Sequence, residues 1–430
     1  MVTSPLQPYG DFLLSLRDAV RLHRSGGQAL AVLMMNLDGV VRVDEALGYE
    51  AGDHVLAVAA QRIHSALRPS DFAGWIGREQ LACALVRLAD DSLASLAAEK
   101  LLRALDEPFD LSGRHWRVMP QVGIAILDRK VEGESDLLRR ATIALHEGRR
   151  RRETYRVFEP GDQDSLALEF DLQTELAQAI DRSELYLCYR PQLELDDDRI
   201  TGAEALLRWN HAAKGPIRPR QIIHAAERAG LMSRLTSWVI STALRECAEM
   251  RRQGLDIGIS INISAITFRD AELDEMFARA LSLWDLPPEV VTIELSESIG
   301  MAETLGAIDV LKKLDEMGLR VSADGFGMGQ SSMMRLRELP FSEMKISRSF
   351  VTDMLRREAN ELIVRSMIDL GSSLGLRVVA DGVNDSDTCD ALRFLGCDVI
   401  QGDLVSPPVS AANLLIDAMH RGDGTQSADE

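Results

Sequence analysis

The sequence predicts an α/β fold in two parts: a sheet covered by helices, followed by a β/α barrel. The chain has 430 residues, enough for two or three domains. Apolar segments of the first part follow a β-α-β-β-α-β order with additional helices. In the second part, short apolar strands alternate eight times with polar or helical segments, as in a β/α barrel.

The composition excludes several classes of protein. A formal net charge of -19 argues against general nucleic-acid binding, which needs a basic face. The sequence has no signal peptide and no apolar run of the ~20 residues that a membrane span needs, so we expect a cytoplasmic protein. The five cysteines are scattered, which predicts reduced thiols and no zinc site.

The first part begins with an amphipathic helix at 11–24, because Phe12, Leu16 and Val20 fall on one side. A wholly apolar segment at 29–35 predicts a buried strand. The remaining expected elements are a helix (52–67), two strands (72–76 and 81–86), a helix (90–105), a strand (117–126) and a helix (135–150).

A polar junction at 161–165 predicts the domain boundary. We expect domains at 1–160 and 183–420, a helical linker at 161–182 and a disordered polar tail at 421–430. Strands of the second domain are expected at 185–190, 201–208, 257–262, 290–294, 319–324, 343–346, 376–381 and 398–401. Helices are expected at 219–229, 233–254, 271–282, 303–317, 354–374 and 386–396.

The strand Gly202–Trp209 carries two charged residues, Glu204 and Arg208, among apolar ones. Charges on a buried strand are costly unless they are paired or used. The pattern alone leaves two interpretations open, a buried ion pair or a site for a metal ion and a phosphate.

Polar residues stand at the ends of successive predicted strands of the barrel. In a barrel these ends converge on one mouth, where such folds place their chemistry. Carboxylates and an amide suit Mg²⁺ or Mn²⁺, and a lysine with Arg208 suits phosphate oxygens, so the pattern indicates metal-assisted phosphodiester chemistry. These strand-end residues are Asn262, Glu294, Asp324, Lys345, Asp381 and Gln401.

Residues 1–158 resemble the GGDEF domain of diguanylate cyclases. The matching stretches are Asn36–Gly39, Leu47–Asp53, Arg68–Asp71 and Leu137–Ala141. The signature turn reads Gly77-Arg-Glu-Gln-Leu81 where the family has Gly-Gly-Asp-Glu-Phe. Arg78 places a large side chain where the family glycine lets backbone approach the nucleotide, Gln80 replaces an acid, and Asn36 stands at a metal-binding aspartate. We therefore expect no cyclase activity.

Arg68 and Asp71 match the family's inhibitory site for cyclic di-GMP. The same spacing also suits a helix end followed by a turn. We treat the pair as a possible remnant of that site.

Residues 185–409 resemble the EAL domain, the barrel of cyclic di-GMP phosphodiesterases. The matching motifs are Gly202–Trp209, Ile261–Ser264, Ile293–Ser298, Ala323–Gly327, Met344–Phe350, Val379–Val383 and Gln401-Gly402. By this resemblance one metal would be bound by Glu204, Asn262, Glu294 and Asp324, which are all present. Lys345 and Glu204 would be catalytic in an active enzyme, and the nucleotide would contact Arg208, Lys345, Gln401, Asp381 and Arg190.

The second metal site of the family is expected to be lost here. Gly325 stands where the family has an aspartate and supplies no ligand. Asp381 replaces a glutamate and is one methylene shorter, whereas metal–oxygen distances tolerate little change. The loop at 326–332 also departs, with Met328 and Gln330 in place of Thr and Tyr, and Arg190 replaces a glutamine.

The sequence leaves three hypotheses. The first is a catalytically impaired receptor or scaffold that binds cyclic di-GMP and acts through a protein partner of unknown identity. The second is a weak phosphodiesterase dependent on Mg²⁺ or Mn²⁺, and the third is a protein-interaction module that no longer binds nucleotide. By resemblance we also expect a homodimer.

Overall fold

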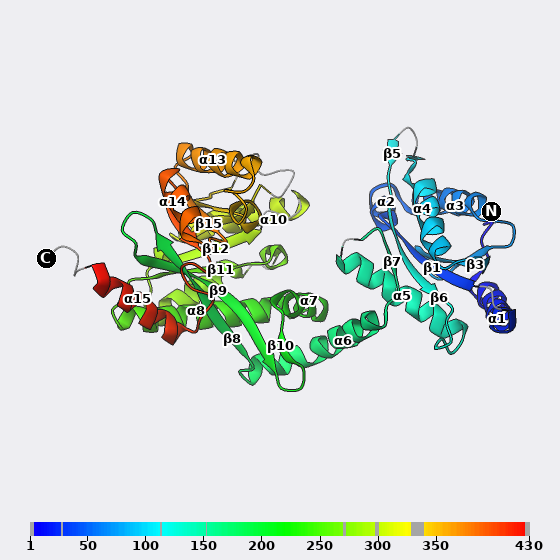
Figure 1. Ribbon diagram of the computed structural model, residues 1–430, viewed down its shortest axis with the longest axis horizontal. Coiled ribbons are helices and arrows are strands. Elements are labelled where there is room, and N and C mark those ends of the chain that lie inside the picture. Colours follow the sequence, from blue (N-terminus) through cyan, green and yellow to red (C-terminus); the bar gives the residue numbers. More distant parts are fainter. Residues whose placement is uncertain are drawn as a thin grey trace. The chain divides into compact units, whose positions relative to one another are not determined.

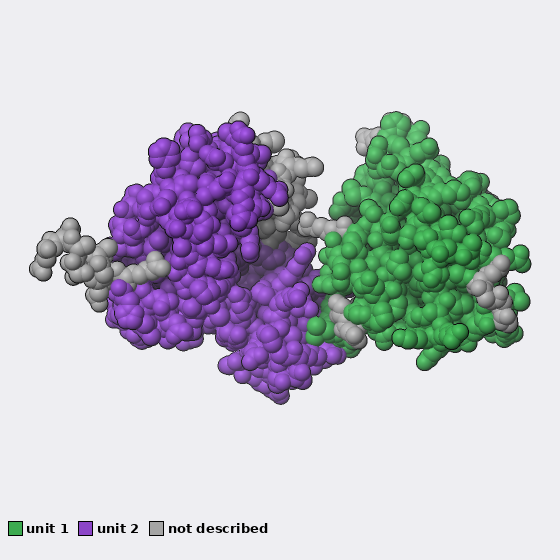
Figure 2. Space-filling model, in the orientation of Figure 1, with its two compact units in different colours: residues 1–170 green, residues 171–430 purple. Residues whose placement is uncertain are grey.

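The computed structural model describes residues 4–26, 29–111, 114–151, 153–269, 272–296, 301–327 and 339–425. The chain divides into two compact units, residues 1–170 and 171–430, which are coloured separately in Figure 2. Each unit has its own hydrophobic core.

The first unit is built on a five-stranded sheet in the order β2-β3-β1-β6-β7 (Figure 1). All neighbours are antiparallel except β6 and β7, which are parallel. The strands are β1 (Ala29–Asp38), β2 (Phe72–Trp75), β3 (Gln80–Leu88), β6 (Met119–Ile126) and β7 (Tyr155–Val157), with a separate hairpin of β4 (Phe109–Leu111) and β5 (Arg114–Trp116). The helices are α1 (Tyr9–Gly26), α2 (Val40–Leu47), α3 (Tyr49–Ala66), α4 (Ser92–Asp106) and α5 (Glu134–Arg151).

Both faces of this sheet are buried, as the wholly apolar sequence of β1 predicts. Alternate side chains of a strand point to opposite faces. Leu33 and Met35 therefore lie in one core cluster, which includes residues of α3 and α4, and Val32 and Met34 lie in the other, which includes residues of α1 and α5. The predicted sheet covered by helices is confirmed.

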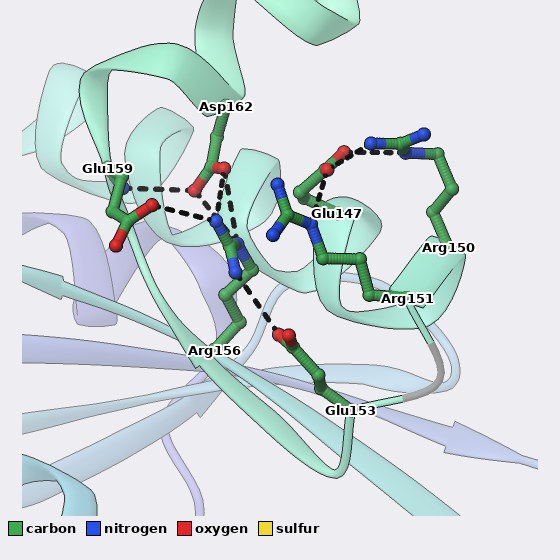
Figure 3. Close-up of polar contacts among 7 residues, drawn as sticks. All are labelled: Glu147, Arg150, Arg151, Glu153, Arg156, Glu159 and Asp162. Atoms are coloured by element: carbon green, nitrogen blue, oxygen red, sulfur yellow. Dashed lines mark hydrogen bonds and ion pairs between the residues drawn. The ribbon is translucent and has the colours of Figure 1, made fainter.

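The helix α6 (Pro160–Asp181) includes the residues at which the chain divides. Its first turn is tied to the end of β7 by the buried Arg156 (Figure 3). Arg156 Nη2 donates to Asp162 Oδ1 at 2.7 Å and to Glu159 Oε2 at 3.0 Å. Asp162 Oδ2 also accepts the backbone N–H of Glu159 at 2.9 Å, which satisfies a donor at the helix start.

The second unit contains a closed barrel of eight strands (Figure 1). These are β8 (Leu185–Glu194), β9 (Ile200–His211), β11 (Gly258–Asn262), β12 (Val291–Ser296), β13 (Arg320–Phe326), β14 (Glu343–Ile346), β15 (Arg377–Asp381) and β16 (Val399–Gln401). The helices after α6 are α7 (Pro219–Ala229), α8 (Met232–Arg252), α9 (Leu273–Trp284), α10 (Met301–Glu316), α12 (Arg348–Val351), α13 (Glu358–Ser373), α14 (Ser386–Phe394) and α15 (Ala411–Thr425), with short 3-10 helices at Ala265–Arg269 and Pro288–Val290.

The barrel differs from a fully parallel one in a single strand. Seven strands are parallel to their neighbours in the order β9-β11-β12-β13-β14-β15-β16, whereas β8 is antiparallel to both β9 and β16. The cause is the short turn that joins β8 directly to β9, because a hairpin reverses the chain and a parallel pair needs a crossover. A further short strand, β10 (Gly215–Ile217), pairs with the outer end of β9.

The carboxyl-terminal helix α15 extends into the segment that the sequence predicts to be a tail. It ends at Thr425, and residues 426–430 lie outside the described range. Leu414 and Ala418, one turn apart, are buried against the barrel core and explain why a helix forms here. Within the described ranges, no helix combines the length and apolar character needed to cross a membrane.

Candidate functional site

The strand-end residues come together at one mouth of the barrel, as their spacing predicts. Strand register sets them side by side in pairs. Asn262 of β11 lies beside Glu294 of β12, and Asp381 of β15 lies beside Gln401 of β16. Asp324 of β13 likewise lies beside Lys345 of β14.

The ammonium of Lys345 lies among the acidic side chains of this mouth. Its Nζ donates to Glu204 Oε2 at 2.9 Å and to Glu294 Oε2 at 2.9 Å, and it lies 3.9 Å from Asp324 Oδ1. Lys345 is 2 % exposed, so these contacts are shielded from water. A buried charge is retained only when it is paired in this way.

Three amide side chains complete the surroundings of Glu204. Asn262 Nδ2 donates to Glu204 Oε1 at 2.8 Å, and Gln401 Nε2 donates to Glu204 Oε2 at 2.9 Å. Gln192 Nε2 in turn donates to Gln401 Oε1 at 3.2 Å. Gln192 was not among the predicted site residues. The sequence feature that relates to it is Gly202 on the neighbouring strand, because a Cβ at position 202 would lie only 2.4 Å from Gln192 Oε1.

The buried position and the close charges of this cluster shift the pKa values of its members in different directions. Burial raises the pKa of Glu204, but the Lys345 ammonium and hydrogen bonds from Lys345, Asn262 and Gln401 together hold it at about 2. Burial, followed by the Glu204 carboxylate, raises the pKa of Glu294 well above its usual value. Burial lowers the pKa of Lys345, but the surrounding carboxylates, Glu204 first, raise it well above normal. The ammonium therefore stays charged.

Arg208 is not the ion-pair partner of Glu204. It lies four residues further along β9, on the same face of the strand. Its Nη1 donates to the carbonyl oxygen of Leu207 at 2.9 Å, and within the described part of the chain its guanidinium forms no ion pair. Glu204 pairs with Lys345 of β14 instead, so the ion pair of this strand is not formed with Arg208.

Asp381 is engaged by two neighbours at the mouth. Gln401 Nε2 donates to Asp381 Oδ1 at 3.0 Å, and Arg190 Nη1 lies 3.5 Å from the same oxygen. Both charged side chains are about one-fifth exposed. Arg190 thus points toward the mouth from β8.

The side chains at the mouth have the right chemical groups to bind a metal ion, but they are not arranged around an open cation site. Three carboxylates and an amide, from Glu204, Glu294, Asp324 and Asn262, have the chemistry of a hard-cation site. In the described residues, however, no three acidic, histidine or cysteine side chains form a ready cation site. The carboxylates close on Lys345, so a cation at these four residues requires the ammonium to move.

In the first unit, Arg78 fills the region of the altered signature turn. Its guanidinium lies 3.0 Å from Asp44 Oδ1 and 3.1 Å from Asp53 Oδ1, and it stacks 5.3 Å from the ring centroid of Tyr49. Asp38 is paired with Arg149 at 2.7 Å. Asp38, Asp44 and Asp53 are therefore already paired with arginines of the chain.

The other residues singled out in the first unit have local roles in the structure. Asn36 lies opposite Gln80 across β1 and β3, and its amide donates to Asp38. Asp71 accepts the backbone N–H of Arg68 at 3.3 Å and that of Val86 at 3.2 Å. This places Asp71 in a turn, which is the second of the two interpretations of that spacing. Residues 297, 328 and 330 lie outside the described ranges.

Comparison with known families identifies the class of protein. The EAL domain matches residues 173–408, and the diguanylate cyclase GGDEF domain matches residues 11–154. The chain belongs to the EAL family and is a tandem GGDEF–EAL protein of the kind found in cyclic di-GMP signalling.

The relatives have named activities. The chain is 32% identical over 402 residues to the bifunctional diguanylate cyclase/cyclic di-GMP phosphodiesterase MucR of Pseudomonas aeruginosa, which covers 93% of this chain and 58% of that protein. It is 31% identical over 393 residues to the cyclic di-GMP phosphodiesterase NbdA of the same species, covering 91% of this chain and 50% of that protein. The chain thus spans about half the length of these relatives.

A solved structure resembles the barrel unit. It is the PaMucR phosphodiesterase in complex with cyclic di-GMP, which is 35% identical with a TM-score of 0.54 and covers 57% of this chain and 99% of that one.

Proposed function

We propose that the barrel mouth binds cyclic di-GMP and that the protein acts as a catalytically impaired receptor or regulatory scaffold. The observation that carries the proposal is the pairing of Asp381 with Arg190, together with the glycine at position 325. Gly325 has no side chain that could bind a cation, and Asp381 Oδ1 lies 3.5 Å from Nη1 of the Arg190 guanidinium. The positive charge of Arg190 thus occupies the surroundings in which the family places a second metal.

The groups for holding a dinucleotide remain. Arg208 has a guanidinium that no described carboxylate neutralises, and it lies on β9 at the rim of the mouth. Guanidinium groups bind phosphate oxygens with paired hydrogen bonds. The cyclic di-GMP bound by the PaMucR structure supports this choice of ligand. Losing a charge-stabilising group costs far more in rate than in binding.

The first unit is proposed to lack cyclase activity. Arg78 bridges Asp44 and Asp53 at the turn, so a nucleotide would have to displace an arginine already held by two carboxylates. The proposed role of this unit is structural or regulatory, with a homodimer and a protein partner as its expected context.

The test is calorimetry on the full chain with cyclic di-GMP, with and without Mg²⁺. We expect saturable binding that Arg208→Ala weakens at least about tenfold, because a charge-assisted contact is removed. Arg252→Ala, on the exposed side of α8, is the matched control and should bind normally. Absence of heat at high micromolar ligand rejects the receptor and leaves an interaction module without nucleotide.

A second function, weak phosphodiesterase activity, is favoured by one observation. Glu204, Asn262, Glu294 and Asp324 are all present at the mouth, and the two relatives named above are phosphodiesterases. These four residues would hold one Mg²⁺ or Mn²⁺, which would activate water for attack on the phosphodiester. Conversion of cyclic di-GMP to the linear dinucleotide should then be abolished by Glu204→Ala, and turnover unaffected by that change is contamination.

A further inference from the structure

The second unit has a cavity of about 680 Å³ at the end of the barrel opposite the mouth. It is lined by the first residues of several strands, among them Gly258 of β11, Arg320 of β13, Glu343 of β14 and Arg377 of β15. On β15, Asp381 at the mouth lies four positions after Arg377, which corresponds to roughly 13 Å along the strand. The size lies within the range of small-molecule sites.

Several charged groups of this cavity are already paired. Arg377 Nη2 binds the Glu194 carboxylate and lies 3.2 Å from Thr201 Oγ1. Arg251 Nη1 lies 2.6 Å from Asp256 Oδ1. The Arg377 contacts link the ends of three strands, the Arg251 pair ties the end of α8 to the loop before β11, and both are explained by stability alone.

Arg320 is different because it lines the cavity and forms no hydrogen bond or ion pair with any residue in the described part of the chain. Burial raises the pKa of the neighbouring Glu343 carboxyl, and the charge of Arg320 is among those that oppose this rise. Arg199, also on the cavity wall, has only a 3.9 Å pair with the exposed Asp197. Two guanidinium groups are thus available to oxygens of an anion.

Glu343 gives the cavity an acceptor that nothing satisfies. Its side chain lines the cavity and is 3 % exposed, yet its Oε1 has no hydrogen-bond partner among the described residues. Burial raises the pKa of Glu343 and the nearby Ser322 hydroxyl opposes this rise, but Ser322 Oγ also has no hydrogen bond of acceptable geometry among the described residues. Leaving such a buried acceptor unpaired is unfavourable, because it loses its hydrogen bonds to water on burial. A ligand N–H or O–H would remove this cost.

We propose that this cavity binds a small organic anion that also carries an N–H donor, with Arg320 and Arg199 holding the anionic group and Glu343 Oε1 accepting from the donor. This site is separate from the mouth. A role in stabilising the fold accounts for the paired arginines of the cavity. It does not account for Arg320 and Glu343, which have no such pairs.

The probe is guanosine 5′-monophosphate, which combines a phosphate with N–H donors, and the comparator is inorganic phosphate, which has the charge alone. Calorimetry on the full chain should show saturable binding of the nucleotide, weakened at least about tenfold by Arg320→Gln. Glu343→Met removes the acceptor for the N–H donor, so the affinity for the nucleotide should fall to a value close to the affinity for inorganic phosphate. Arg320 is exposed at a strand start, so its substitution should leave the fold intact.

Two further variants separate this site from others. Arg279→Gln on α9, an exposed arginine away from the cavity, should bind the nucleotide normally. Guanosine 5′-monophosphate can also contact Arg208 at the mouth, so the decisive titrations use Arg208→Ala as the background, in which saturable binding that depends on Arg320 should persist. No saturable heat at millimolar nucleotide, binding that survives Arg320→Gln, or binding removed by Arg208→Ala each overturns the proposal. Equal affinity for phosphate and nucleotide overturns the role given to Glu343.

Discussion

At Gly325 the backbone has a φ of +72°, and a Cβ built there meets no atom within 4 Å. Space is therefore available for a carboxylate, and aspartate is among the residues that tolerate this backbone region best. The matching position, Asp381, is held by Gln401 and Arg190. If a longer glutamate replaced Asp381, its carboxylate would have to give up the contact with Arg190 in order to bind a cation.

These two positions give a prediction of restored chemistry. The double variant Gly325→Asp with Asp381→Glu should hydrolyse cyclic di-GMP at least about a hundredfold faster than the unmodified chain, since each charge-stabilising group contributes about that much. Chromatography of the linear dinucleotide, with Mg²⁺ or Mn²⁺, measures it. The same double variant carrying Glu204→Ala should be inert.

A double variant that binds cyclic di-GMP and remains inert would contradict this account of Gly325 and Asp381. The block would then lie at Arg190 or in the altered loop at 326–332. Adding Arg190→Gln to the double variant tells these two causes apart, because it removes the guanidinium without touching the loop.

At the level of elements, the first turn of α6 depends on a buried ion pair. Asp162 is 2 % exposed and Arg156 is 8 % exposed, and the arginine also binds Glu153 at 3.2 Å and Glu159 at 3.0 Å (Figure 3). The hydrogen bonds to Asp162, together with the other carboxylate partners, raise the pKa of Arg156 above its usual value although burial opposes this rise. Removing the arginine would leave a carboxylate buried without its counter-charge.

We therefore predict that Arg156→Met destabilises the first unit by about 3–5 kcal/mol, measured by urea denaturation. Adding Asp162→Asn should recover part of this loss, because asparagine removes the charge and can still accept the Glu159 N–H. Arg103→Met is the matched control, since its pair with Glu99 is exposed, and should change stability by less than ~0.5 kcal/mol. A loss no larger than the control's would refute the anchoring role.

The elements also show what sequence can and cannot predict. The barrel strands were predictable because each is a short apolar segment that ends or begins at a polar residue, as at Asp381 and Arg377. The antiparallel direction of β8 was not, because periodicity carries no information on strand direction. The helix α2 was missed as well, since its eight residues follow β1 almost directly and offer only two turns of pattern.

The candidate site was predictable to the same extent. Strand ends converge in any barrel, so the meeting of Glu294, Asp324 and Lys345 followed from the pattern. The position of the Lys345 ammonium between Glu204 and Glu294 depends on side-chain conformations across several strands, which spacing does not determine. Glu343 was overlooked for another reason. It stands at a strand start, and only polar residues at the carboxyl ends of barrel strands are expected to meet at the mouth.

At the level of the whole molecule, the two units have separate cores. One cluster of buried residues fills the barrel unit, and two others lie on the faces of the sheet in the first unit. Because the cores share no buried residue, each unit is expected to unfold in its own transition. A ligand that binds one unit then stabilises that unit alone.

Because the two units are expected to unfold separately, the unfolding temperature of one unit can serve as an internal control for the other. Cyclic di-GMP at about 100 times its dissociation constant adds about 2.7 kcal/mol to the stability of the unit that binds it, which corresponds to a rise of roughly 5–10 °C in its Tm. Scanning calorimetry of the full chain should show this rise in the transition of the barrel unit, and Arg208→Ala should abolish it. The transition that Arg156→Met lowers identifies the first unit, and it should not move with ligand. A rise confined to that transition would place the nucleotide on the first unit, near Arg68 and Asp71, and would reject the barrel mouth as the receptor site.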